Sequence, residues 1–85
     1  MNIEQIWANI RKHDNEIFKT KTGIEFSYHT TAGTIYFHNT NRPIGKSTIQ
    51  RALLVENMTV NKLRKADIHS NSYVYGILTD PRIIG

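Results

Sequence analysis

The side chains best suited to acid–base chemistry in this 85-residue chain lie close together, between residues 25 and 38. They are Glu25, His29, Tyr36 and His38. Imidazole groups can donate or accept a proton near neutral pH, so this set could cleave RNA without a metal ion. Its spacing matches no metal-binding motif, so a metal ion would need a further ligand from elsewhere in the chain. In the alternative interpretation, these polar residues only occupy the solvent-exposed face of a β-hairpin.

No complete catalytic or metal-binding motif occurs anywhere in the sequence. The chain also has no cysteine, which excludes disulfide bonds and thiolate chemistry. We therefore expect a protein that binds no cofactor and whose role is binding rather than catalysis.

A second candidate site is the stretch NTNRPIGKSTIQRALL, residues 39–54, which predicts the end of a strand, a tight loop and the start of a helix. Pro43 lacks an N–H and disfavours helical angles at the preceding residue, so the strand cannot run straight into the helix. Two positions could cap that helix. Ser47 and Gln50 have the spacing of a capping box, whereas in the other register Gly45 is the cap.

In either register, the start of this helix is predicted to bind an anion. Free N–H groups and the positive end of the helix dipole face Arg42, Lys46, Ser47 and Thr48, which could together hold a phosphate. The letters GKST also end a Walker A motif, but the first glycine of that motif would fall on Thr40, so hydrolysis of a nucleoside triphosphate is not expected. The alternative is a capped helix without a ligand.

Positive charge is concentrated in the middle of the chain. Residues 42–65 contain six basic residues and one acidic residue, a net charge of +5, whereas the whole chain carries only +4. Localised positive charge indicates a polyanionic partner such as DNA or RNA. Besides the helix start, the residues predicted to contact phosphate are Arg51, Lys62, Arg64 and Lys65. The alternative is a basic face that only contacts solvent.

Three predicted elements position the residues of the first half. Residues 3–19 have apolar residues at helical spacing and a cap at Asn2, which indicates an amphipathic helix. Residues 24–29 and 34–38 alternate between apolar and polar residues and should form a hairpin around the turn 30–33. If His29 pairs with Thr34, the apolar side chains share one face of the hairpin. The other face would then hold Glu25, Ser27, His29, Tyr36 and His38.

Two short helices and an apolar segment are predicted for the second half. The helix that opens near Lys46 should be followed by one that Thr59 caps, with Lys62, Arg64 and Lys65 facing outward. Residues 73–78 are apolar throughout, which favours a buried third strand, with a short helix capped by Ser72 as the alternative.

Together these patterns predict an α+β fold in one small domain spanning residues 1–85. An N-terminal amphipathic helix packs on an antiparallel β-hairpin, and two short helices and the apolar segment, a third strand or a short helix, follow. The expected function is a small basic nucleic-acid-binding protein, with a regulatory role as one option. It would contact phosphates through Gly45–Thr48 and Lys62–Lys65.

Two other functions remain open from the sequence. One is a small metal-independent ribonuclease that uses His29, His38 and Tyr36. The other is a non-enzymatic protein-interaction subunit, a homodimer included, that docks through Ile83–Ile84 or through a hairpin edge. The polar start of the chain shows no leader segment and no apolar run could span a membrane, so we expect a cytoplasmic protein without a membrane partner.

Overall fold

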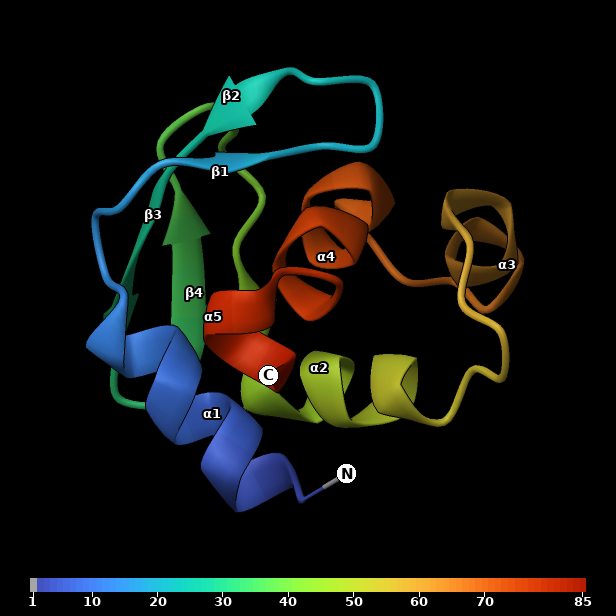
Figure 1. The fold of residues 1–85 in the computed structure, drawn as a ribbon, viewed down its shortest axis with the longest axis horizontal. Coiled ribbons are helices and arrows are strands. Elements are labelled where there is room, and N and C mark those ends of the chain that lie inside the picture. Colours follow the sequence, from blue (N-terminus) through green and yellow to red (C-terminus); the bar gives the residue numbers. More distant parts are fainter. Residues whose placement is uncertain (1) are drawn as a thin grey trace.

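In the computed structural model, which describes residues 2–85, two small antiparallel sheets are packed against helices (Figure 1). The first sheet pairs β1 (Phe18–Lys19) with β2 (Glu25–Phe26), and the second has the order β3 (Tyr28–Thr31), β4 (Thr34–Phe37), β5 (Ile44–Gly45). The helices are α1 (Ile3–Lys12), α2 (Lys46–Leu53), α3 (Val60–Lys65), α4 (Asn71–Leu78) and α5 (Pro81–Ile84). The predicted α+β class is confirmed, and so is the predicted helix that begins the chain.

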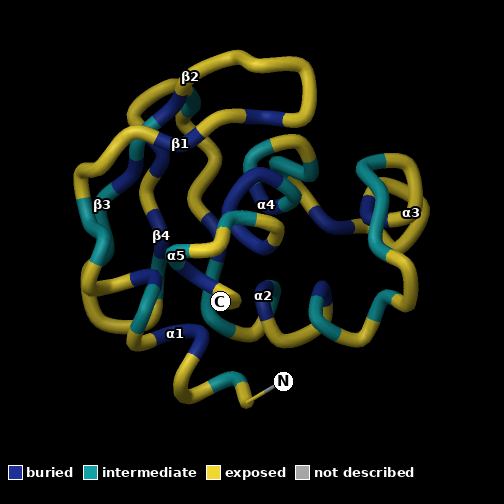
Figure 2. Tube along the Cα trace, in the orientation of Figure 1, coloured by how far each residue is buried: buried dark blue, intermediate teal, exposed yellow. Residues whose placement is uncertain are grey.

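Helix α4 lies in the middle of the fold, with strands on one side and α3 on the other (Figure 1). Its side chains belong to one buried cluster that also contains residues from α1, α2, α5 and both sheets (Figure 2). Helix α3 contributes Leu63 to this cluster and forms one edge of the molecule. None of the helices in residues 2–85 has the length and apolar character that crossing a bilayer would require.

Helix α1 ends at Lys12, earlier than the predicted boundary at residue 19. The predicted cap is right, because the Asn2 side chain accepts a hydrogen bond from the Glu4 N–H at 2.8 Å. The chain leaves the helix through Asn15, which adopts a left-handed conformation with φ of 64°. This break allows Phe18 to enter the core from strand β1 while Ile17 stays 60 % exposed. A continuous helix would have carried both residues along the same stripe.

The hairpin of β3 and β4 has the predicted faces but a different register. Tyr28 pairs with Phe37 and His29 with Tyr36, not with Thr34. The prediction placed four residues in the turn, whereas the turn is only Ala32 and Gly33, and it is Ala32 that has the positive φ of 48°. Because the register differs by two residues, each side chain keeps its predicted face.

Two strands were not predicted. Residues 20–24 connect β1 and β2 in a hairpin, in which Thr20 Oγ1 accepts the Ile24 N–H at 3.1 Å. Residues 44–45 form β5, which extends the second sheet through the pairs Thr34–Gly45 and Ile35–Ile44. The loop that contains Pro43 therefore connects two neighbouring strands of one sheet.

Residues 73–78 belong to helix α4, so the favoured prediction of a third strand there is wrong and the short-helix alternative is right. The cap is Ser70 rather than Ser72, and its side chain makes no capping hydrogen bond. The physical reason is burial: Val74 and Ile77 are fully buried, and the segment lacks the polar positions that would have revealed a helical period.

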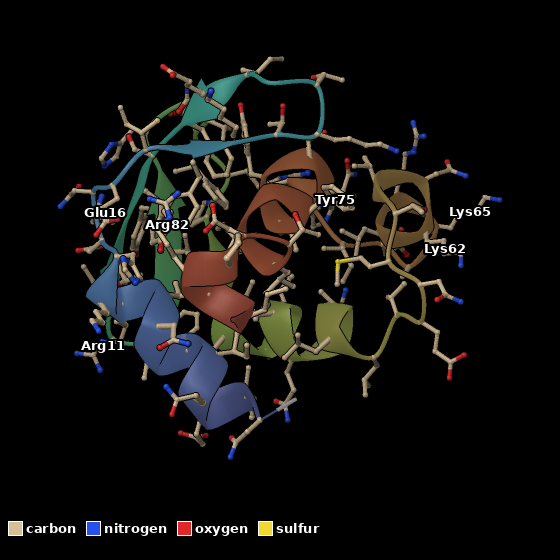
Figure 3. The ribbon with its side chains drawn as sticks, in the orientation of Figure 1. Arg11, Glu16, Lys62, Lys65, Tyr75 and Arg82 are labelled. Atoms are coloured by element: carbon tan, nitrogen blue, oxygen red, sulfur yellow. The ribbon has the colours of Figure 1, made fainter. Side chains whose placement is uncertain are left out.

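The C-terminal helix α5 is held to the segment that follows α1. Asp80 caps α5 by accepting the Arg82 N–H, and its carboxylate also binds the Arg82 guanidinium at 2.9 and 3.0 Å. The same guanidinium contacts Glu16 at 3.0 Å (Figure 3). It also lies 3.9 Å from the centre of the Phe18 ring. Ile83 is fully buried, so docking through Ile83–Ile84 is contradicted for its first residue.

The contacts of Arg82 also affect the pKa values of the two carboxyl groups beside it. The Arg82 guanidinium beside Asp80 holds the pKa of that carboxyl below its usual value. The pKa of Glu16 is also lowered, chiefly by its hydrogen bond with His13 and then by Arg82. The folded protein therefore favours the ionised form of both carboxyl groups.

Candidate functional site

The start of α2, predicted to hold a phosphate, is already occupied by contacts within the protein. Gly45 is the helix cap and no side chain caps it, so the capping box of Ser47 and Gln50 is wrong and the alternative register is right. The Lys46 N–H donates to the Gly33 carbonyl at 2.8 Å, and the Lys46 ammonium group pairs with the Glu4 carboxylate at 2.9 Å. A phosphate here would compete with that carboxylate.

Two other predicted residues, Arg42 and Arg51, reach instead toward the segment that follows α3. Arg42 Nη1 donates to His69 Nδ1 at 3.0 Å, which leaves the proton of a neutral His69 ring on its other nitrogen. Arg51 Nη2 donates to the Asp67 backbone carbonyl at 3.2 Å. Because Asp67 and His69 follow directly after α3, the fold brings these two arginines near the basic end of that helix.

Helix α3 has the predicted arrangement. The Thr59 side chain caps it by accepting the Lys62 N–H at 3.1 Å, and Leu63 is fully buried. Lys62, Arg64 and Lys65 are exposed. Figure 3 shows Lys62 and Lys65 directed away from the body of the molecule, on the opposite side from Arg11. Their partners are neutral: Lys62 donates to the Glu56 backbone carbonyl, and Arg64 to the Asn61 amide oxygen.

We refer to five exposed cations as the basic surface: Arg42, Arg51, Lys62, Arg64 and Lys65. Within residues 2–85, none of the five forms an ion pair, whereas Lys46 and Arg82 do. The structure thus separates Lys46, with its neighbours Ser47 and Thr48, from the other predicted residues. What distinguishes the remaining five is that no carboxylate neutralises them.

Unpaired cations also occur at the end of α1, but their setting differs. Arg11 and Lys12 line a hollow together with the acidic Asp14. Residues 42–67, which contain the basic surface, hold six basic residues and only two acidic residues, Glu56 and Asp67.

Two hollows are lined by residues that are next to Arg42 or His69 in the sequence. One, of about 330 Å³, is lined by Tyr36, Phe37, Thr40, Asn41 and Pro43, so Arg42 lies within the loop that forms its wall. The other, of about 320 Å³, lies between the β1–β2 turn and the start of α4, and its wall includes Ser70, the neighbour of His69. Both hollows combine aromatic or aliphatic surface with hydroxyl and amide groups.

The polar face of the hairpin gathers four of its five predicted members. Ser27 Oγ and His38 Nδ1 are 2.8 Å apart, and His38 Nε2 lies 3.3 Å from His29 Nδ1. The His29 ring stacks on Tyr36 with a centroid distance of 5.1 Å and an interplanar angle of 13°. Glu25, on β2, takes no part in these contacts. Among residues 2–85, no three His, Asp or Glu side chains gather where they could hold a metal ion.

Sequence reasoning did not find His69, nor the hollow beside Tyr36. His69 lies in the segment between α3 and α4, which the fold brings beside Arg42 in the Pro43 loop. No local signal marks such a pair, since 27 positions separate the two residues.

Comparison with known proteins gives no relative: no protein-family model matches the chain, and no curated protein or solved structure matches it.

Proposed function

We propose that this protein binds nucleic acid through the basic surface, with phosphate groups as the main contacts. The observation that carries the proposal is that all five cations lack an ion-pair partner within residues 2–85, although the chain has carboxylates that pair elsewhere. A cation without an internal partner can neutralise a phosphate and release its counterion, which is the main source of sequence-independent affinity.

The arrangement of the cations supports the proposal. Lys62, Arg64 and Lys65 lie in the last turn of a helix that forms an edge of the molecule. Arg42 and Arg51 extend the charge toward the segment after that helix. A phosphate chain can therefore meet several cations without any carboxylate having to move.

Lys46, Ser47 and Thr48 contribute less in this proposal than the sequence suggested. A phosphate at the start of α2 would have to displace Glu4 from Lys46 and accept one N–H fewer, because Gly33 already accepts that of Lys46. We therefore place the phosphate contacts at α3 and at the loop before β5, rather than at the start of α2.

Charge reversal tests the proposal with a matched control. Lys62→Glu/Lys65→Glu and Arg11→Glu/Lys12→Glu change the net charge equally, and both pairs lie in the last turn of a helix. Any cost from the helix dipole is therefore shared. We expect the first variant to lose at least tenfold in affinity for a mixed-sequence oligonucleotide in a fluorescence anisotropy titration, and the second to lose much less. Equal losses would show that net charge, not this surface, governs binding.

The hydrogen-bonded chain from Ser27 through His38 to His29 favours ribonuclease chemistry as a second candidate. In this function, one imidazole would remove a proton from the attacking hydroxyl and the other would protonate the leaving group. The two rings lie too close for a phosphate between them, since their nitrogens are 3.3 Å apart, so cleavage would require the pair to open. Incubating labelled RNA with the protein and with His38→Ala, both in chelator, tests this function: cleavage by the first alone would support it.

A further inference from the structure

We infer that the nucleic acid on the basic surface is single-stranded, and that one of its unpaired bases enters the hollow beside Tyr36. This inference rests on the proposed function and specifies its substrate. It is carried by the position of the hollow, whose wall is formed by β4 and by the loop 38–43 that also carries Arg42.

The lining of the hollow suits a nucleobase. Tyr36 is 39 % exposed and brings an aromatic ring to the wall, and Pro43 adds an apolar ring. The Asn41 amide and the Thr40 hydroxyl supply donors and acceptors for the edge of a base. Stacking on an aromatic ring combined with hydrogen bonds to a base edge is the usual way in which proteins hold unpaired bases.

The Tyr36 ring is held in place before any ligand arrives. It stacks on His29 with an interplanar angle of 13°, and His29 is in turn held by His38 and, through it, by Ser27. The polar face of the hairpin therefore acts as a support for the exposed tyrosine. A ring that is already ordered loses little conformational entropy when a base stacks on it.

Arg42 supplies the charge that a nucleotide in the hollow would need. Its guanidinium group donates one N–H to His69 and forms no ion pair within residues 2–85, so further N–H groups remain for a phosphate. The phosphate attached to a base beside Tyr36 would thus lie next to a cation of the basic surface. Bases in a duplex are stacked and paired and cannot enter such a hollow, so the arrangement selects single strands.

The test compares the parent protein with Tyr36→Ala and with Tyr36→Phe, which keeps the ring. The probes are fluorescein-labelled 12-residue single strands of RNA and of DNA with the same mixed sequence, and the corresponding duplexes, titrated at one salt concentration. We expect the parent to bind at least one of the single strands about tenfold more tightly than its duplex. Tyr36→Ala should weaken single-strand binding about tenfold and leave duplex binding unchanged, because stacking on one aromatic ring has an effect of that size. Tyr36→Phe should bind as the parent does.

The results of this test distinguish a failure of the single-strand inference from a failure of the proposed function. Equal affinity of the parent for single strands and duplexes, or parental single-strand affinity in Tyr36→Ala, would overturn the inference. If Lys62→Glu/Lys65→Glu still weakened binding in that case, the proposed function would stand without it. Because Tyr36 is exposed, a urea melt followed by the fluorescence of Trp7, which is buried, should show that Tyr36→Ala is folded. Tighter binding of the RNA single strand than of the DNA single strand would indicate a contact with the 2′-hydroxyl group.

Discussion

Replacing Gly76 by alanine should destabilise the protein, although alanine is the better helix former. Gly76 lies inside α4, where the helix packs directly against β1. A Cβ atom at this position would lie 2.6 Å from the Lys19 backbone carbonyl oxygen and 2.9 Å from Cε1 of Phe26. The carbonyl oxygen belongs to a strand and cannot rotate away as a flexible side chain would, so the helix and the hairpin would have to separate.

Two opposing contributions decide the size of the effect. Alanine gains about 1 kcal/mol over glycine in a helix interior. Overpacking in a core costs about 1–3 kcal/mol and occasionally more, and a contact with backbone at this distance lies at the upper end of that range. We expect a net loss of about 2 kcal/mol in the free energy of unfolding, which corresponds to a decrease in Tm of about 8–16 °C for a protein of this size.

Urea denaturation followed by the fluorescence of Trp7, the single tryptophan, measures this loss. Gly33→Ala is the control, because a Cβ atom there would meet no atom within 4 Å and the backbone needs no positive φ. This control should change the free energy of unfolding by no more than about 1 kcal/mol. A Gly76→Ala protein as stable as the parent would refute the close packing of α4 against β1.

Two further predictions concern buried contacts and pH. The Tyr28 hydroxyl donates to the Ile10 carbonyl at 2.7 Å, so Tyr28→Phe should cost about 1–3 kcal/mol in urea melts at pH 7 by leaving that carbonyl without a partner. Burial raises the pKa of Tyr28 above its usual value, so the stabilisation that Tyr28 gives the folded protein is complete below about pH 10 and falls progressively above it. The difference in the free energy of unfolding between parent and variant should therefore shrink from pH 9 to pH 11. A constant difference would contradict this. Arg82→Met should lower Tm at pH 7, and because the pKa values of Asp80 and Glu16 are lowered in the folded state, this deficit should shrink as the pH falls below about 4. A deficit in Tm at pH 3 as large as the one at pH 7 would show that the ion pairs contribute nothing.

Alternation predicted the faces of the hairpin correctly but not its register. A strand has a period of two, so an error of two residues leaves each side chain on its correct face. Tyr28 and Phe37 are thus buried, and Tyr36 exposed, as expected. The turn length could not be predicted, because Ala32 carries no preference for the left-handed conformation that it adopts.

Local patterns also predicted the helices unevenly. Thr59 and the charges of α3 form a local signal, and both the cap and the exposed lysines were predicted correctly. The boundary of α1 was missed because Ile17 and Phe18 continue the helical spacing beyond the real end of the helix. Segment 73–78 was misread because burial removed its polar positions.

The candidate site was predictable only as a charge pattern. The basic residues between 42 and 65 could be counted from the sequence. Which of them stays free depends on contacts between distant segments, such as Lys46 with Glu4 and Arg42 with His69. These contacts move the proposed phosphate site from the start of α2 to α3 and the Pro43 loop.

The salt dependence of oligonucleotide binding tests the central claim most directly. The logarithm of the binding constant should fall linearly with the logarithm of the salt concentration, with a slope of about −0.7 per phosphate contacted on a single strand or about −0.9 on duplex DNA. Lys62→Glu/Lys65→Glu should make the slope shallower by about 1.4 or more on a single strand, whereas Arg11→Glu/Lys12→Glu should leave it unchanged. A parent whose binding hardly responds to salt, or the same change of slope in both variants, would contradict the assignment of the basic surface as the phosphate-binding site.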